Sequence, residues 1–300
     1  MSKSEPRRGG TRKRASCPDY FADTGDCCPP QSTSNPSKPN VPHPVSDPTG
    51  YEYKGKFESV GDYEKVYVTG PNDAKHALVV IYDIFGFWDT TIRGSDLLAS
   101  HLLLTSPTKI YMPDVFKGKP FPKDQDGNKE ELKKFFAGTA KLDDRLPEVL
   151  NFAKALKKDH GINRVSILGY CWGESTFNLF ECLTDRHLAG GKLALLSLTS
   201  GTPFCCGAVI HPAMIAPEDG ENLTVPFGFY PSMDEPKDVV EKIEEAIKSK
   251  PFASKSDYHL YDTVHHGWAA ARADLKNPEN LKQYEDVYQR TADYFAKVKC

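Results

Sequence analysis

The chain has 300 residues, of which 39% are hydrophobic and 26% are charged, and its 38 Lys and Arg against 41 Asp and Glu give a net charge of −3. These values are ordinary for a globular protein of one or two domains, and they exclude a fully disordered chain. The near-neutral balance gives no reason to expect a nucleic-acid partner. No run of eighteen apolar residues is present, so we expect no membrane span.

Eight cysteines in 300 residues are too few for a disulfide scaffold, and none has the spacing of a zinc ribbon. We therefore expect free thiols and no metal site. Residues 1–16 hold six basic residues and no apolar run, so they do not form a secretory signal. A cytoplasmic location follows as the expectation, and the basic cluster leaves a nuclear location open.

Two regions differ in composition. Residues 1–50 contain the basic cluster, and residues 29–50 include seven prolines, which predicts a flexible N-terminal arm that cannot bury enough apolar surface to order itself. Residues 51–300 alternate between strand and helix patterns and are predicted to form one domain.

Short apolar runs in the second region predict strands, with the first at a sheet edge: 65–69, 76–82, 109–112, 165–168, 207–210, 227–230 and 258–261. Helical patterns lie between them: 92–104, 129–156 with a break, 174–183, 237–250 and 280–298. This alternation predicts an α/β fold, with a mostly parallel sheet and helices on both faces. Gly190-Gly191 is interpreted as an ordinary turn.

A nucleophile motif follows the strand at 165–168, where Gly169-Tyr-Cys171-Trp-Gly173 leads into an expected helix. In a G-x-C-x-G sequence at a strand-to-helix turn, the central residue sits on a sharp turn above the sheet. The glycines avoid collisions with the neighbouring strand and helix. Because a helix N-terminus stabilises a thiolate, we predict Cys171 as the nucleophile.

The loop after the last strand contains two histidines, in the sequence Asp262-Thr-Val-His265-His266-Gly-Trp268. A histidine there is placed to act as general base for the thiol. Two adjacent histidines cannot both face one thiol, and we prefer His266 because the glycine after it allows close backbone approach. His265 is expected to be exposed. His211, after the strand at 207–210, is a further candidate for lining the pocket.

The base needs a carboxylate that fixes its tautomer. Asp234 follows the strand at 227–230, and an Asp in such a Pro-rich turn could also cap the next helix. The order Cys171, Asp234, His266 is nevertheless that of α/β-hydrolases, so we predict Asp234 as the acid. Glu235 is the alternative.

The loop after the strand at 76–82 is expected to face the nucleophile. The backbone N–H groups of Ile84 and Trp172 would form an oxyanion hole, and Asp83 would influence the ionisation of the thiol. All three tryptophans, Trp88, Trp172 and Trp268, fall on or beside these loops. Their placement predicts an apolar substrate pocket.

These motifs carry a resemblance. Asp83-Ile-Phe-Gly86, the Cys171 motif, and His266-Gly-Trp268 with Arg272 beyond resemble the dienelactone hydrolase family in its fungal form, over about residues 50–298. The resemblance implies an α/β-hydrolase fold and a Cys171–Asp234–His266 triad. It also places Arg272 near an arginine that binds the substrate carboxylate, and Asp83 where bacterial members have a glutamate that contacts the thiol.

We therefore expect a cysteine-dependent hydrolase of lactones or small carboxylic esters. It would need no cofactor and would act on a small molecule as a monomer or homodimer. The bacterial members use a second arginine that has no counterpart between Arg93 and Arg145, which favours neutral substrates. The alternative is a thiol-based redox or binding protein that uses a reactive Cys171, with Cys205 and Cys206 or the N-terminal cysteines as resolving partners.

Overall fold

A computed structural model describes residues 51–171 and 190–298. The arm expected at 1–50 and the helix expected at 174–183 lie outside the described residues. The described strands form one eight-stranded sheet in the order β1-β2-β4-β3-β5-β6-β7-β8. Their bounds are β1 Lys56–Val60, β2 Tyr63–Thr69, β3 His76–Ile81, β4 Thr108–Pro113, β5 Arg164–Tyr170, β6 Gly207–Ile210, β7 Phe227–Tyr230 and β8 Asp257–Tyr258.

The sheet is mostly parallel, which confirms the predicted fold class. From β4 through β8 every neighbouring pair is parallel, and only β2 runs against both of its neighbours, β1 and β4. The central strand β3 is the continuous apolar run of the sequence. Its residues from Ala77 to Ile81 are at most 1% exposed, as expected for a strand covered on both faces.

The edge of the sheet differs from the prediction. The segment 65–69 belongs to β2, which lies between β1 and β4. The edge strand on this side is β1, whose residues are largely exposed apart from Val60, and β8 forms the other edge. The mixed polar sequence of β1 lacks the apolar run by which the other strands were recognised.

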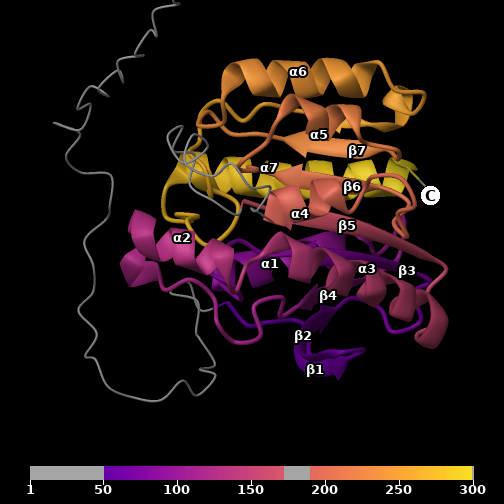
Figure 1. Ribbon diagram of the computed structural model, residues 1–300. Coiled ribbons are helices and arrows are strands. Elements are labelled where there is room, and N and C mark those ends of the chain that lie inside the picture. Colours follow the sequence, from indigo (N-terminus) through magenta and orange to yellow (C-terminus); the bar gives the residue numbers. More distant parts are fainter. Residues whose placement is uncertain (1–50, 172–189, 299–300) are drawn as a thin grey trace, which may run out of the picture. The chain divides into compact units, whose positions relative to one another are not determined.

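Helices cover both faces of the sheet. Helix α1 (Asp89–Leu102) contacts α7 (Pro278–Val298), and α3 (Leu142–Asp159) contacts α4 (Gly190–Leu196). Figure 1 shows α7 behind the sheet and α3 and α4 in front of it. The remaining helices are α2 (Lys129–Ala137), α5 (Pro217–Glu221) and α6 (Lys237–Lys248), and two short 3-10 turns are η1 (Lys123–Gln125) and η2 (Ala253–Lys255).

Of two local predictions, the helix break is confirmed and the glycine turn is wrong. The break expected within 129–156 lies between α2, which ends before Gly138, and α3. The Gly190-Gly191 pair, interpreted as a turn, instead begins α4. A side chain at Gly191 would lie 3.0 Å from the carbonyl oxygen of Cys171, and the N–H of Gly191 donates to that oxygen at 2.7 Å. The glycine therefore allows α4 to approach the nucleophile turn.

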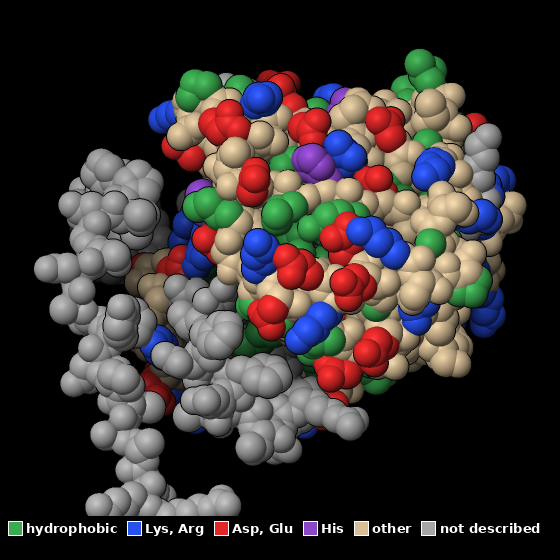
Figure 2. Space-filling model, turned by 90° about the horizontal axis from the view of Figure 1, so that it is seen from above, with side chains coloured by type: hydrophobic (Ala, Val, Ile, Leu, Met, Phe, Trp, Pro, Cys, Tyr) green, Lys and Arg blue, Asp and Glu red, His purple; other side chains and the backbone are tan. Residues whose placement is uncertain are grey.

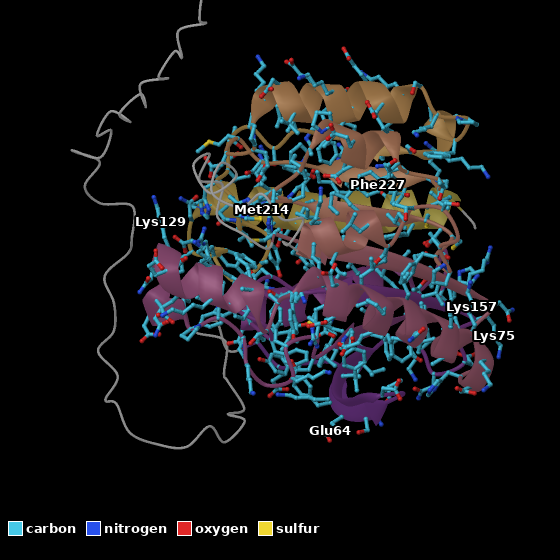
Figure 3. All side chains as sticks on the ribbon, in the orientation of Figure 1. Glu64, Lys75, Lys129, Lys157, Met214 and Phe227 are labelled. Atoms are coloured by element: carbon cyan, nitrogen blue, oxygen red, sulfur yellow. The ribbon has the colours of Figure 1, made fainter. Side chains whose placement is uncertain are left out.

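Apolar side chains lie in the interior and charged side chains lie at the surface. Phe227 is fully buried and lies among the interior side chains, whereas Lys75 and Lys157 point outward (Figure 3). The face seen in Figure 2 carries acidic and basic side chains interspersed. Within the described ranges, no helix is long and apolar enough to cross a membrane.

Candidate active site

The candidate site is built by the loops that follow four neighbouring parallel strands. Cys171 follows β5, His211 follows β6, Glu235 follows β7 and His266 follows β8. Because the strands are adjacent and parallel, their carboxyl ends meet at one edge of the sheet. One ligand atom from each of Cys171, His211 and His266 lies within 4.8 Å of the other two.

Cys171 occupies a sharp turn. Its φ is 39°, in the left-handed region that residues other than glycine rarely adopt. The turn is held on both sides, because the N–H of Cys171 donates to the carbonyl of Ile210 at 3.4 Å and its own carbonyl accepts the Gly191 N–H. The thiol is free and the residue is only 7% exposed. This geometry is the strained turn that the G-x-C-x-G motif predicts.

His266 is buried beside the thiol and a carboxylate. Its Nδ1 lies 2.6 Å from Oε1 of Glu235, which leaves Nε2 available to Cys171. Burial lowers the pKa of His266, but the negative charge and hydrogen bonding of Cys171, and then those of Glu235, outweigh burial and raise it to about 10. A protonated imidazole beside Sγ of Cys171 would stabilise negative charge on the sulfur.

The carboxylate at the imidazole is Glu235, not the predicted Asp234. Asp234 Oδ2 instead accepts a hydrogen bond of 2.7 Å from the backbone N–H of His266. Glu235 Oε2 also accepts the backbone N–H of Ser232, which fixes the Glu235 carboxylate on its own turn. Two consecutive side chains of this turn therefore serve different parts of His266: Glu235 orients the ring, and Asp234 holds the loop.

The choice between the two loop histidines agrees with the prediction. His265 is exposed, whereas His266 is 4% exposed. Gly267 follows with a φ of 92°, and a side chain there would lie 3.0 Å from Cβ of Arg272. The glycine thus permits the tight turn that directs His266 inward.

His211 is a second buried histidine at the site. Its ring centroid lies 5.1 Å from that of His266 and 5.1 Å from that of Trp268. The residue is fully buried, and among the described residues neither ring nitrogen has a hydrogen-bond partner. Burial, followed by the nearby charge of His266, holds the pKa of His211 well below its usual value, so the ring is neutral.

The apolar substrate pocket expected at the three tryptophans stays a prediction. Trp268 is fully buried and packs against His211 and Tyr261, with a centroid distance of 4.9 Å to Tyr261. Trp268 therefore supports the histidines from within the core. Trp88 is 36% exposed, and Trp172 lies outside the described residues.

Asp83 joins two loops of the site. It is 1% exposed, and its carboxylate accepts the backbone N–H of Phe85 at 3.0 Å and that of Ala271 at 2.9 Å. Burial raises the pKa of Asp83, although both hydrogen bonds and the charges of Arg272 and Lys123 oppose that rise. The carboxylate is thus occupied in tying the loop after β3 to the loop that carries His266.

The residue after Asp83 is Ile84, whose side chain is 3% exposed. The carbonyl of Ile84 accepts the N–H of Phe121 at 2.8 Å, which holds this backbone in place. Its role in an oxyanion hole stays a prediction, as does that of Trp172.

Two cations lie near the ring of Phe85. The Arg272 guanidinium carbon is 5.7 Å from the ring centroid, and Lys123 Nζ is 5.8 Å from it. Arg272 is paired with Asp126, with Nη2 2.6 Å from Oδ1. Lys123 donates to the carbonyl of Ala271 at 2.8 Å and lies 4.1 Å from the centroid of the Trp88 ring. Sequence reasoning missed Lys123, which lies in η1 without a recognisable motif.

The cysteine pair at 205–206 also departs from the expectation of free thiols. Cys205 is disulfide-bonded, whereas Cys206 carries a fully buried thiol that is not in a disulfide. Burial raises the pKa of Cys206 to about 12, although hydrogen bonds from Ser166 and Tyr294 and the charge of Arg164 oppose the rise. Neither sulfur is therefore a ready thiolate.

The sequence is similar to those of known proteins. The profile of the Dienelactone hydrolase family matches residues 65–180. An uncharacterized AIM2 family protein of Schizosaccharomyces pombe is 28% identical over 255 residues, which cover 83% of this chain and 93% of that protein. A carboxymethylenebutenolidase homolog of Xenopus tropicalis is 25% identical, with 85% of this chain and 96% of that protein covered.

The fold has solved counterparts as well. A Klebsiella pneumoniae crystal structure described as a dienelactone hydrolase superposes with a TM-score of 0.59 at 15% sequence identity. The superposition covers 81% of this chain and 98% of that one. The fold is therefore that of the α/β-hydrolases, as the sequence predicts.

Proposed function

We propose that this chain is a cysteine-dependent hydrolase of lactones or small carboxylic esters, of the kind found in the dienelactone hydrolase family to which it is similar. The observation that carries the proposal is the buried Glu235–His266 pair beside the strained Cys171 turn. Each member has the chemical property that its role requires: a thiol, a base of raised pKa, and a carboxylate that fixes the tautomer of the base.

The proposed reaction proceeds in two stages. The Cys171 thiolate attacks the ester carbonyl carbon, and backbone N–H groups such as that of Ile84 stabilise the oxyanion. The tetrahedral intermediate then expels the alkoxide, which takes the proton from Nε2 of His266, and a thioester remains on Cys171. Water attacks the thioester while His266 accepts its proton, and departure of the carboxylic acid product restores the thiolate–imidazolium pair.

The same residues argue against the redox alternative. A peroxide-reducing or disulfide-exchanging Cys171 needs a resolving thiol. Cys205 is already disulfide-bonded, and the Cys206 thiol is buried with a raised pKa. Within the described ranges, Cys171 therefore has no second reactive thiol, which favours hydrolysis; the N-terminal cysteines of the redox alternative lie outside those ranges.

A substrate comparison tests the proposal directly. The wild-type chain, Cys171→Ala and Cys206→Ser are assayed with p-nitrophenyl acetate and a set of lactones, after circular dichroism has shown that each is folded. We expect turnover in the wild type and in Cys206→Ser, and none above background in Cys171→Ala. Turnover in a folded Cys171→Ala protein would refute the mechanism, and peroxide consumption without ester turnover would favour the redox reading.

We also propose that neutral substrates are preferred over anionic ones. Arg272 is neutralised by Asp126, and Lys123 is held by a carbonyl and an aromatic ring, so neither cation is fully available to a substrate carboxylate. Asp126→Asn should release Arg272 and raise kcat/KM for a carboxylate-bearing ester, with little change for its neutral analogue. A wild-type preference for the anionic ester would contradict this proposal.

A further inference from the structure

The side chains that follow β5, β6 and β8 have the chemistry of a metal site. A cysteine thiolate and two histidine imidazoles are the ligands that Zn²⁺ takes in proteins. In Cys171, His211 and His266 one ligand atom each lies within 4.8 Å of the others, and all three residues are buried. Ligand atoms around a tetrahedral Zn²⁺ with bonds of about 2.0–2.3 Å are about 3.5 Å apart. The three side chains would therefore need to approach one another by roughly an ångström.

His211 is the residue that the hydrolytic mechanism leaves unexplained. Both of its ring nitrogens are buried, and neither has a hydrogen-bond partner in the described part of the chain. An unsatisfied buried polar group destabilises the fold, and a metal–nitrogen bond would satisfy one of these nitrogens.

The other two ligands are the thiol and the imidazole of the proposed hydrolytic site. The Cys171 thiolate is the form that binds a metal ion. The His266 imidazolium would release the proton that faces Cys171 to solvent, and the nitrogen it leaves would take the metal. Glu235 stays on the opposite ring nitrogen, Nδ1, as carboxylates do behind histidines that bind metals.

We infer that Cys171, His211 and His266 bind one Zn²⁺ ion, and that the bound ion reversibly blocks the proposed hydrolysis. The sulfur electron pair that would attack a carbonyl is committed to the metal, and the nitrogen that would accept a proton from water is committed as well. Zinc binding rests on the geometry alone. The loss of turnover also rests on the proposed function.

Metal binding is tested on the full chain, reduced with a phosphine and freed of metal with a chelator. Calorimetric titration with Zn²⁺ should give one equivalent, and Co²⁺ should produce the thiolate-to-cobalt charge-transfer band of a cysteine ligand. His211→Gln should weaken Zn²⁺ binding at least tenfold. The matched control is His265→Gln, the same substitution at the exposed histidine next to His266, and Cys206→Ser removes a buried thiol outside the cluster; both should bind as the wild type does.

Inhibition is then measured with each variant compared against its own metal-free rate. Zn²⁺ should abolish ester turnover of the wild type and of His265→Gln, a chelator should restore it, and His211→Gln should need at least tenfold more Zn²⁺. Absence of stoichiometric binding, or binding unaffected by His211→Gln and Cys171→Ser, would overturn the site. Binding that leaves turnover intact would overturn the inhibition. A metal-free protein inactive on every ester would refute the proposed function and leave the titrations to decide the site.

Discussion

The loops after β6 and β8 each place one buried histidine at the same edge of the sheet, and the two rings lie 5.1 Å apart. Their exposures are nearly equal, 0% for His211 and 4% for His266. Their pKa values nevertheless shift in opposite directions. Burial is the first cause for both and lowers both, and only at His266 do the charges and hydrogen bonds of Cys171 and Glu235 reverse it.

This comparison teaches that burial does not decide where the proton of the site resides. The partners decide, and they come from other loops: Glu235 from the turn after β7 and Cys171 from the turn after β5. The imidazole ring of His266, in the loop after β8, therefore carries the positive charge. The β6 loop keeps a neutral ring beside it, because a second imidazolium would be repelled by the first.

The largest effect is expected from removing the charged histidine. His266→Ala should lower kcat/KM for esters by a factor on the order of 10³, because base and acid functions are both lost. His265→Ala, at the exposed neighbouring position, should stay within about tenfold of the wild type. If His266→Ala lowered kcat/KM only slightly and His211→Ala lowered it strongly, His211 and not His266 would be the general base.

A smaller effect is expected from the carboxylate that makes the two histidines different. Glu235→Gln keeps the shape of the side chain but removes the charge at Nδ1, so kcat/KM should fall by a factor on the order of 10² or more. The alkaline limb of the pH–rate profile should also move to lower pH, because the pKa of His266 falls. Asp234→Asn still offers an acceptor to the His266 N–H and should lose less than about tenfold. The opposite ranking would restore Asp234 as the acid.

The smallest effect is expected on stability. The pKa shifts of the two histidines predict that His266 loses its stabilisation at alkaline pH and His211 at acid pH. The His266 pKa is raised above that of the unfolded chain, about 6.5, so its stabilisation is complete below that pH and is lost as pH rises towards 10. The His211 pKa is lowered, so its contribution is present above about pH 6.5 and is lost as pH falls. A scan of Tm against pH on the wild type, His211→Gln and His266→Gln measures both limbs.

The expected changes in Tm are a few degrees, because a change of about 1 kcal/mol in the free energy of unfolding moves the Tm of a domain of 150–250 residues by ~2–4 °C. His211→Gln should flatten the acid limb alone, and His266→Gln the alkaline limb alone. Equal effects of both substitutions on one limb would show that the two histidines do not differ in protonation.

The sequence patterns predicted the central strands closely, for a physical reason. The strands at 207–210 and 227–230 are continuous apolar runs, and the structure has them with the same bounds. A strand covered on both faces leaves this mark in the sequence. The edge strand β1 was missed because most of its residues face solvent and carry no such run.

Sequence reasoning named Cys171 and His266, which the structure brings together, and missed by one residue the carboxylate at the imidazole; the catalytic roles of these residues stay predictions. Cys171 and His266 follow a recognisable motif and a glycine-bearing loop, whereas Asp234 and Glu235 are consecutive acids in one turn. A turn has no periodicity from which to predict which of two neighbouring residues faces inward. In the folded chain, Glu235 is held in its inward position by a hydrogen bond from the backbone N–H of Ser232. Lys123 was missed because the long connection after β4 carries no period at all.

The Asp83 carboxylate, which accepts N–H groups from Phe85 and Ala271, has a consequence for engineering. Segments 83–88 and 265–272 are nearly 190 residues apart in the chain, yet one buried side chain fastens them together. Transplanting either segment alone from a relative would leave an amide or a carboxylate without its counterpart in the interior. Chimeras that aim to change substrate preference should therefore exchange both segments together, including Asp83.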